Sequence, residues 1–461
     1  MGSFVVIVYL NNYKNVKSMY SKSYFRKLSR LATPIIIGQI GVVFVSFVDT
    51  FMVGHYGTNE LAAASFVNNV TMILIIAGLG FAMGLSPLVS KAVGQGSRFK
   101  AGAFLKAGLK TNGILACLVA LVLLIMYFNL DKMGQPAVLM PLIENYFIIV
   151  SFSILTTFIF NTFKQFTDAT MNTSVSMMII ITSNIINVIG NYVLIYGKAG
   201  FPELGLQGAG ISTLIARLYA VIAMILYFLK SPKMSEYKKG FYHSSSRESN
   251  IMMKEISRIG TPVCIQMLME SASFSLIVIM VGWLGTTELA AHQVMATISQ
   301  LCFTFYIAVG NATSILISNY NGQGMKNSIL SIANTGYILI LCISIISNVG
   351  ILISFDGLVS LFTDSENVRE MTLQILLPFV LYQFGDGLQI CFSNALRGIQ
   401  QVKPILPIAF ISYIIISLPV SYLLGFVFKM GLPGIWFGYP ISLTFAGLLY
   451  YITFRKRQKR I

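Results

Sequence analysis

Three carboxylic acids stand inside long apolar stretches of this 461-residue chain: Asp49, Glu270 and Asp386. An ionisable side chain is costly within a membrane span, so each acid is a functional candidate. A carboxyl group in a low-dielectric interior can exchange a proton or hold a cation near neutral pH. Two alternatives remain open, namely a hydrated position near the headgroups for Asp49 and a neutral, packing role for the other two.

Helical spacing groups several amides with the first of these acids. Asn184, Asn187 and Asn191 are three and four residues apart, which places them on one helical face. Their carbonyl oxygens, with the Asp49 carboxylate and the Thr213 hydroxyl, would form an all-oxygen set suited to Na⁺. The alternative is that the amides only hydrogen-bond neighbouring helices together.

Other polar residues are weaker candidates. Arg217 lies within a predicted span, where it could either pair with an acid or extend toward the cytoplasm. Asn161 and Asn394 occupy similar motifs, IFNTFKQ and FSNALRG, and are secondary candidates. Asp168 is predicted to be solvated near a helix end. Neither the histidines nor the five cysteines have metal-ligand or disulfide-framework spacing.

The elements that carry these residues are predicted to be membrane-spanning helices. The chain is 56% hydrophobic and 10% charged, whereas a soluble domain carries roughly 25% charged residues. Strands would need alternating patterns that are absent here. Twelve apolar stretches are each long enough to cross a bilayer. They span approximately 31–53, 61–90, 108–130, 140–163, 172–196, 205–230, 257–283, 289–319, 328–355, 368–396, 404–428 and 433–454.

The net charge of +16 reflects topology rather than nucleic-acid binding. When loops are assigned alternately to the two sides, 27 of the 32 Lys and Arg residues fall on the side of both termini. This bias predicts a multi-pass inner-membrane protein with cytoplasmic termini. The basic excess would contact anionic lipids.

The two halves of the sequence repeat each other. MVGHYGTNELAA at 52–63 returns as MVGWLGTTELAA at 280–291, an offset of 228 residues. Six spans per repeat predict two parallel six-helix bundles, related by a pseudo-two-fold axis along the membrane normal. The expected organisation is a tail (1–30), an N-lobe (31–230), a polar linker (231–256), a C-lobe (257–454) and a basic tail (455–461).

The sequence resembles the multidrug and toxic compound extrusion (MATE) family, in particular its NorM-like branch. The resemblance covers about residues 30 to 450 and rests on segments such as PIIIGQIGVVFVSFVDTFMVGHYGTNELAAAS, GLGFAMGLSPLVSKAVGQG and MVGWLGTTELAAHQV. It implies a two-lobed exporter that exchanges Na⁺ or H⁺ for organic, often cationic, drugs. By the same resemblance, Asp49, Glu270 and Asp386 fall on family acids, Asn187 and Asn191 on the helix-5 pair, and Thr213 on a helix-6 hydroxyl.

Some relatives carry an acid where Asn191 stands, and its absence here argues against a proton relay between two acids in the first lobe. The second-lobe pair, Glu270 with Asp386, resembles the sodium-coupled branch, so the resemblance favours Na⁺. We expect a monomer that needs no cofactor besides its coupling ion. No enzyme motif is visible. The main alternative is a lipid or lipid-linked oligosaccharide flippase of the same superfamily, although one Arg and three acids within the spans suit a cationic cargo better.

Overall fold

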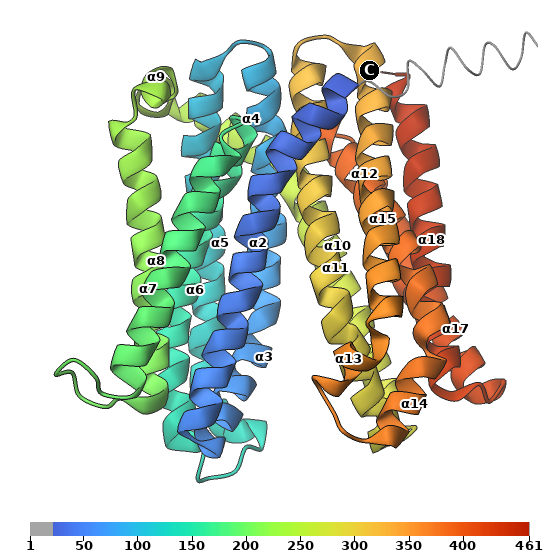
Figure 1. The fold of residues 1–461 in the computed structure, drawn as a ribbon. Coiled ribbons are helices and arrows are strands. Elements are labelled where there is room, and N and C mark those ends of the chain that lie inside the picture. Colours follow the sequence, from blue (N-terminus) through green and yellow to red (C-terminus); the bar gives the residue numbers. More distant parts are fainter. Residues whose placement is uncertain (1–21, 461) are drawn as a thin grey trace, which may run out of the picture. The chain divides into compact units, whose positions relative to one another are not determined.

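The structure, a computed structural model, describes residues 22–460, and all regular secondary structure in that range is helical. Most of the tail expected at 1–30 lies outside the described residues, but 22–30 already form the first turns of a long helix. Figure 1 shows long helices running alongside one another with short connections.

Within residues 22–460, eleven helical segments are long and apolar enough to cross a membrane, and a bent helix pair counted as one span gives twelve. The predicted all-helical, twelve-span fold is therefore confirmed. The first six spans are α2 (Lys22–Tyr56), α3 with α4 (Thr58–Ala82, Leu85–Gly94), α5 (Arg98–Tyr127), α6 (Met140–Ala169), α7 (Thr173–Ile195) and α8 (Gly205–Lys230).

The other six spans follow after a short connection. They are α10 (Ser246–Gly282), α11 (Thr286–Gly322), α12 (Lys326–Ile353), α14 with α15 (Glu366–Gln374, Leu376–Gly398), the segment α16, η3, α17 and η4 (Ile405–Ala409, Phe410–Ser417, Leu418–Tyr422, Leu423–Val427) and α18 (Gly431–Gln458). Four short elements connect the spans: η1 (Leu130–Met133), η2 (Pro232–Met234), α9 (Ser235–His243) and α13 (Phe355–Ser360).

The sequence repeat is also visible in the helix boundaries. Equivalent ends in the two halves are 228 residues apart, as in the aligned sequence segments. These pairs are the starts at 58 and 286, the ends at 94 and 322, and the next starts at 98 and 326. The same local sequence therefore sets the same helix ends in both halves.

Proline explains where two spans break. Its ring lacks an N–H and clashes with the carbonyl four residues earlier. Pro378 therefore interrupts the helix at Gln374, where α14 and α15 meet at a bend of 49°. Pro87 likewise accounts for the turn at Met83 between α3 and α4. The second half has Ile315 at the position equivalent to Pro87, and α11 runs without a break.

The chain divides into two compact units. The N-unit is Ile37–Met267, and the C-unit comprises Leu268–Ile461 with Met1–Ile36, as far as these residues are described. Both divisions fall within a helix, in α2 and in α10. Each of these helices therefore begins in one unit and ends in the other.

Polar contacts attach the start of α2 to the C-unit. The Tyr24 hydroxyl donates to Ser328 Oγ at 2.8 Å. Lys27 Nζ donates to the Tyr320 hydroxyl at 2.6 Å, and its ammonium also lies 5.3 Å from the centre of that ring. The basic residues at the start of this helix are therefore partly used in helix packing.

Close backbone packing attaches the start of α10 to the N-unit. A Cβ on Gly84, at the α3–α4 turn, would lie 2.6 Å from the backbone nitrogen of Gly260. A Cβ on Gly260 would in turn lie 2.6 Å from the carbonyl oxygen of Phe81. Glycine at these two positions is what lets the helix backbones touch.

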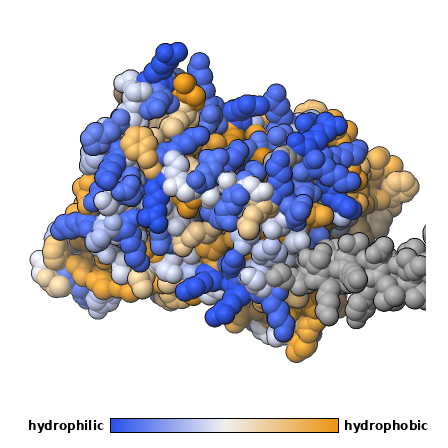
Figure 2. All heavy atoms as spheres, turned by 90° about the horizontal axis from the view of Figure 1, so that it is seen from above, coloured by the Kyte–Doolittle hydropathy of each residue, from blue (hydrophilic) through white to orange (hydrophobic). Residues whose placement is uncertain are grey.

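The polar linker expected at 231–256 is largely helical, because it contains η2, α9 and the start of α10. Helix α9 packs against α5 through two glycines. A Cβ on Gly102 would overlap the carbonyl oxygen of Tyr237, and one on Gly240 would overlap that of Phe99. Lys106 Nζ also donates to the backbone oxygen of Ser244 at 2.8 Å. Figure 2, viewed onto the end of the molecule that carries α9, shows a largely hydrophilic surface there.

Candidate cation-binding site

The N-unit brings together all four members of the predicted oxygen set. Asp49 lies on α2, Asn187 and Asn191 on α7, and Thr213 on α8. The Asn191 amide nitrogen donates to Asp49 Oδ1. The Asn187 amide nitrogen donates to Thr213 Oγ1 at 3.2 Å, and that hydroxyl donates to the backbone oxygen of Ala209 at 3.0 Å. Three helices that are separate in sequence thus meet at one polar cluster.

Two carbonyl oxygens in this cluster are left without a partner. Asn187 and Asn191 are only 3% and 0% exposed. The Oδ1 atoms of both side chains make no hydrogen bond within the part of the chain that the structure describes. Buried acceptors are normally satisfied. These two oxygens are therefore available to a ligand that accepts electron density, such as a cation.

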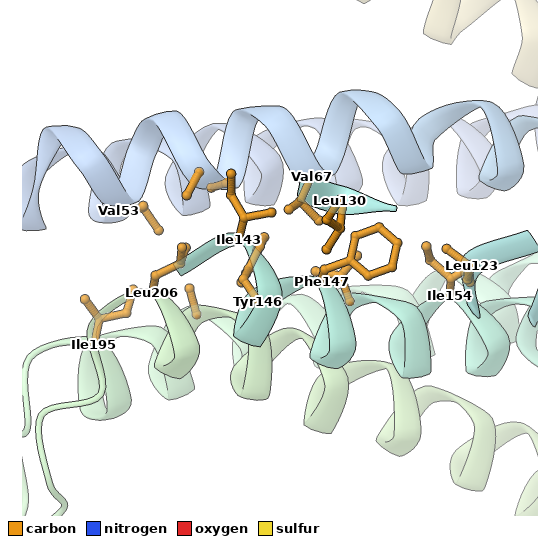
Figure 3. Close-up of a cluster of buried hydrophobic side chains, with 14 of the residues drawn as sticks. Val53, Val67, Leu123, Leu130, Ile143, Tyr146, Phe147, Ile154, Ile195 and Leu206 are labelled. Atoms are coloured by element: carbon orange, nitrogen blue, oxygen red, sulfur yellow. The ribbon is translucent and has the colours of Figure 1, made fainter. Parts of the chain in front are cut away.

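A buried apolar core, whose side chains Figure 3 shows, begins one helical turn from the cluster. Val53 follows Asp49 by one turn of α2, and Ile195 follows Asn191 by one turn of α7. Both are buried, at 4% and 0% exposure, in a core cluster that also includes Leu206. Apolar packing next to the carboxylate keeps the local dielectric low, which strengthens its interaction with any nearby charge.

Arg217 remains inside the N-unit. Its Nη1 donates to Ser153 Oγ at 2.8 Å, and the guanidinium interacts electrostatically with Asp49 and Tyr146. No carboxylate oxygen lies within 4 Å of it among residues 22–460, so the interaction with Asp49 is not a direct ion pair. Of the two sequence alternatives, the structure favours charge compensation within the bundle.

Asn184 lies on the same face of α7 but outside the oxygen set. Its amide nitrogen faces Gly41 of α2, where an added Cβ would approach it to 2.8 Å. This nitrogen is buried and has no hydrogen-bond partner in the described part of the chain. Asn184 therefore contributes to the contact between α2 and α7, eight residues before Asp49 on α2.

The C-unit contains the other two acids in different surroundings. Glu270 of α10 lies close to the Tyr413 hydroxyl and interacts electrostatically with Arg397. The Gln389 amide nitrogen donates to that same hydroxyl. The Tyr413 backbone oxygen, which belongs to the π-helical segment η3, accepts a 3.0 Å hydrogen bond from Ser273.

Asp386 of α15 is 1% exposed, and neither of its carboxylate oxygens has a hydrogen-bond partner among the described residues. It is close enough to Glu270 for electrostatic interaction. A buried, unpaired carboxylate is strongly unfavourable. The group must therefore be neutralised by a proton or a bound cation.

Sequence reasoning missed three members of the C-unit cluster: Arg397, Tyr413 and Gln389. The alternating loop assignment places Arg397 among the loop charges, but it is 6% exposed and lies within α15. The prediction that the spans contain one arginine is therefore wrong. A sequence signal existed, because polar residues recur every three or four positions along this helix, at 383, 386, 389, 393 and 397.

The secondary candidates do not join these clusters. Asn394 donates to the backbone oxygen of Ile390 at 2.8 Å and packs on Gly310, where a Cβ would lie 2.7 Å from its amide nitrogen. Asn161 is half-buried on α6. The prediction for Asp168 is wrong, because this residue is 3% exposed and forms a 3.0 Å ion pair with Lys164. Its neighbours on packed helices bury it.

The fold and the repeated spans define a multi-pass helical membrane protein with buried acids in both units. A family model described as MatE matches residues 34–193 and 262–423, one segment in each half. The chain belongs to the MatE family, as the sequence resemblance predicted.

Its relatives agree with this assignment. A multidrug resistance protein NorM of Vibrio parahaemolyticus is 30% identical over 92% of this chain and 93% of its own length. A probable multidrug resistance protein NorM of Photorhabdus laumondii is 28% identical over 95% and 97%.

Solved structures share the fold. The Vibrio cholerae MATE transporter VcmN in its bent form covers 96% of this chain and 98% of its own, with a TM-score of 0.84 at 18% identity. The eukaryotic MATE transporter AtDTX14 covers 95% and 98%, with a TM-score of 0.84 at 19% identity.

Proposed function

We propose that this transporter is an antiporter that exports organic, mostly cationic compounds by alternating access, in exchange for an inward-moving Na⁺ or H⁺. The observation that carries the proposal is the pair of buried, unpartnered amide oxygens of Asn187 and Asn191 beside the Asp49 carboxylate. Oxygen ligands around one carboxylate suit a hard monovalent cation, so we favour Na⁺. The NorM relatives, named as multidrug resistance proteins, support an exporter of several drugs.

The hydrogen bonds of the cluster suggest how binding would proceed. In this arrangement the Asn191 and Asn187 amides point their nitrogens at Asp49 and Thr213. Rotation of each side-chain amide by about half a turn exchanges its nitrogen and oxygen. A cation at Asp49 would then be held by the carboxylate, two amide oxygens and the Thr213 hydroxyl. Without the cation, the amide nitrogen satisfies the carboxylate.

Glu270 and Asp386 form the second candidate coupling site, in the C-unit. Glu270 has Tyr413 and Arg397 near it, whereas Asp386 has no hydrogen-bond partner among residues 22–460. Because the two acids interact electrostatically, the charge state of one must affect the other. Such a pair can bind or release a cation as its surroundings change.

A cationic cargo is favoured over an anionic lipid headgroup. The half-buried Arg217 and the buried Arg397 interact with acids of their own unit, Asp49 and Glu270. Their charge is therefore compensated and does not form an anion-binding surface. This argues against the flippase alternative.

The remaining features of the proposal follow from the sequence. The transporter would lie in the bacterial inner membrane with both termini cytoplasmic, as the distribution of Lys and Arg indicates. It would act as a monomer with lobes at 31–230 and 257–454, in contact with lipids and small molecules. It would have no enzymatic activity, no nucleic-acid partner and no cofactor beyond the coupling ion.

Dye efflux from proteoliposomes under separately imposed Na⁺ and H⁺ gradients tests the coupling. We expect ethidium efflux to follow an inward Na⁺ gradient and to stop when that gradient is collapsed. In a drug-sensitive bacterium, expression should raise resistance to cationic dyes and to some fluoroquinolones. Unchanged resistance and efflux, despite verified membrane insertion, would favour the flippase.

A further inference from the structure

A second group of polar side chains lies next to Asp386, between α11, α12 and α15. These three helices pack on one another within the C-unit. We call this group the polar file; it consists of Tyr306, Ser344, Asn348 and Gln383, exposed by 0%, 0%, 4% and 0%. Their hydroxyl groups and both amides, like the Asp386 carboxylate, make no hydrogen bond in the described part of the chain.

The inner end of the polar file adjoins Asp386. The next residue, Gly387, lets α12 come close, because a Cβ there would lie 2.6 Å from Ile340 Cγ2 and 3.6 Å from Ser344 Oγ. Tyr306 of α11 lies near Ser344 and interacts electrostatically with Asp386. The Tyr306 hydroxyl of α11 and the Ser344 hydroxyl of α12 thus lie beside the part of α15 that carries Asp386.

The outer end of the polar file is formed by Asn348 and Gln383, each about one helical turn from Ser344 or Asp386 on its own helix. Asn348 follows Ser344 by four residues on α12, and Gln383 precedes Asp386 by three on α15. Because α12 and the bent pair α14 with α15 are consecutive spans that run in opposite directions, both steps lead toward the same end of the bundle, where α12 ends at Ile353 and α14 begins at Glu366. Asn348 is five residues before Ile353, or about 8 Å along the axis at about 1.5 Å per residue.

Isolated unpaired polar groups would destabilise a helix bundle, but Tyr306 lies near Ser344, and Asn348 and Gln383 follow at one-turn spacing on the helices of Ser344 and Asp386. Buried polar groups in native proteins are satisfied by protein atoms or by ordered water, and a water molecule needs several polar partners around it. The polar file offers such partners at each level. Polar residues within membrane spans also mark ion pathways.

We propose that the polar file is a water-filled path along which a small monovalent cation reaches Asp386. This inference rests on the proposed coupling role of Asp386. The path approaches the acid from α11 and α12, whereas Glu270 is surrounded by Tyr413 and Arg397. Neutral amides and hydroxyl groups can replace a cation's hydration shell without binding it permanently.

Accessibility to Ag⁺, a thiol-reactive monovalent cation, tests the path without requiring transport. Ser344→Cys is introduced into a variant whose five cysteines are replaced by alanine. Ile277→Cys serves as the matched control, because Ile277 is also 0% exposed but lies on α10, which carries no member of the polar file; it is five residues before the end of that helix at Gly282. Thiols left unreacted after timed Ag⁺ exposure of proteoliposomes are counted by maleimide labelling in detergent.

We expect Ser344→Cys to react at least tenfold faster than Ile277→Cys. Adding Asn348→Leu should slow the Ser344→Cys reaction at least tenfold, because an apolar side chain of similar size interrupts the path. Gln383→Met offers a second block on the other helix if the first variant misfolds. Equal rates at 344 and 277 would overturn the proposal, and so would a rate at 344 that neither block changes.

The readout separates this inference from the proposed function. If the Ag⁺ rates follow expectation but no gradient drives efflux, the path stands and the coupling proposal fails. If efflux is coupled but Ser344→Cys and Ile277→Cys react alike, the coupling proposal stands and the path fails.

Discussion

Substitution of Asn187 by alanine should weaken Na⁺ binding far more than it weakens the fold. The Asn187 amide nitrogen makes one hydrogen bond of 3.2 Å to Thr213, and its oxygen makes none among the described residues. Loss of that hydrogen bond should lower the free energy of unfolding by about 1 kcal/mol. If the oxygen is a cation ligand, its loss should cost about 1–3 kcal/mol of binding, or about tenfold to a hundredfold in Na⁺ affinity.

Two measurements together distinguish a ligand from a packing residue. A Na⁺ titration of ethidium efflux gives the half-saturating concentration, and thermal unfolding with and without Na⁺ reports binding independently of transport. Asn184→Ala is the matched control, because Asn184 lies one turn away on the same face of α7 and has an unpaired amide nitrogen near Gly41. We expect the control to keep the wild-type Na⁺ dependence. An unchanged titration for Asn187→Ala would refute the oxygen-set interpretation.

Further variants test the other sites. Asp386→Asn and Glu270→Gln should each be expressed at near-normal levels but reduce gradient-driven efflux to that of protein-free vesicles. The neutral side chains keep the shape of the acids but cannot alternate between charged and neutral states. Wild-type efflux would show that these acids serve only in packing. Arg217→Gln should tighten apparent Na⁺ binding by about tenfold, because it removes a positive charge that competes with Na⁺ for Asp49. The two side chains are not in direct contact, so their interaction contributes less than about 4 kcal/mol. A weaker Na⁺ response would contradict this prediction. Gly102→Ala should lower stability by about 1–3 kcal/mol through overlap with α9. Gly113→Ala, on the same helix with nothing within 4 Å of the added Cβ, should not lower the melting temperature.

Local sequence signals were sufficient to predict the membrane spans and the repeat. Long apolar stretches can satisfy their backbone hydrogen-bonding groups in a membrane only as helices, so hydropathy alone predicts twelve spans. Helix ends were less certain, because amphipathic turns such as those at 22–30 extend beyond the apolar stretch. The helical α9 was also missed, since its polar sequence acquires order from glycine contacts with α5.

The sequence by itself determined the helical membrane class, the duplicated half and the three acids within the spans, Asp49, Glu270 and Asp386. Hydrophobicity, repetition and the position of a charge can all be read from the order of the residues. Only the tertiary structure decided what each polar group faces. Asn191 meets Asp49 across 142 positions of sequence, Arg397 lies within a bundle rather than in a loop, and the polar file assembles from three helices. Hydrogen-bond and charge partners depend on how helices rotate and pack against one another, and helical spacing within one segment cannot specify that.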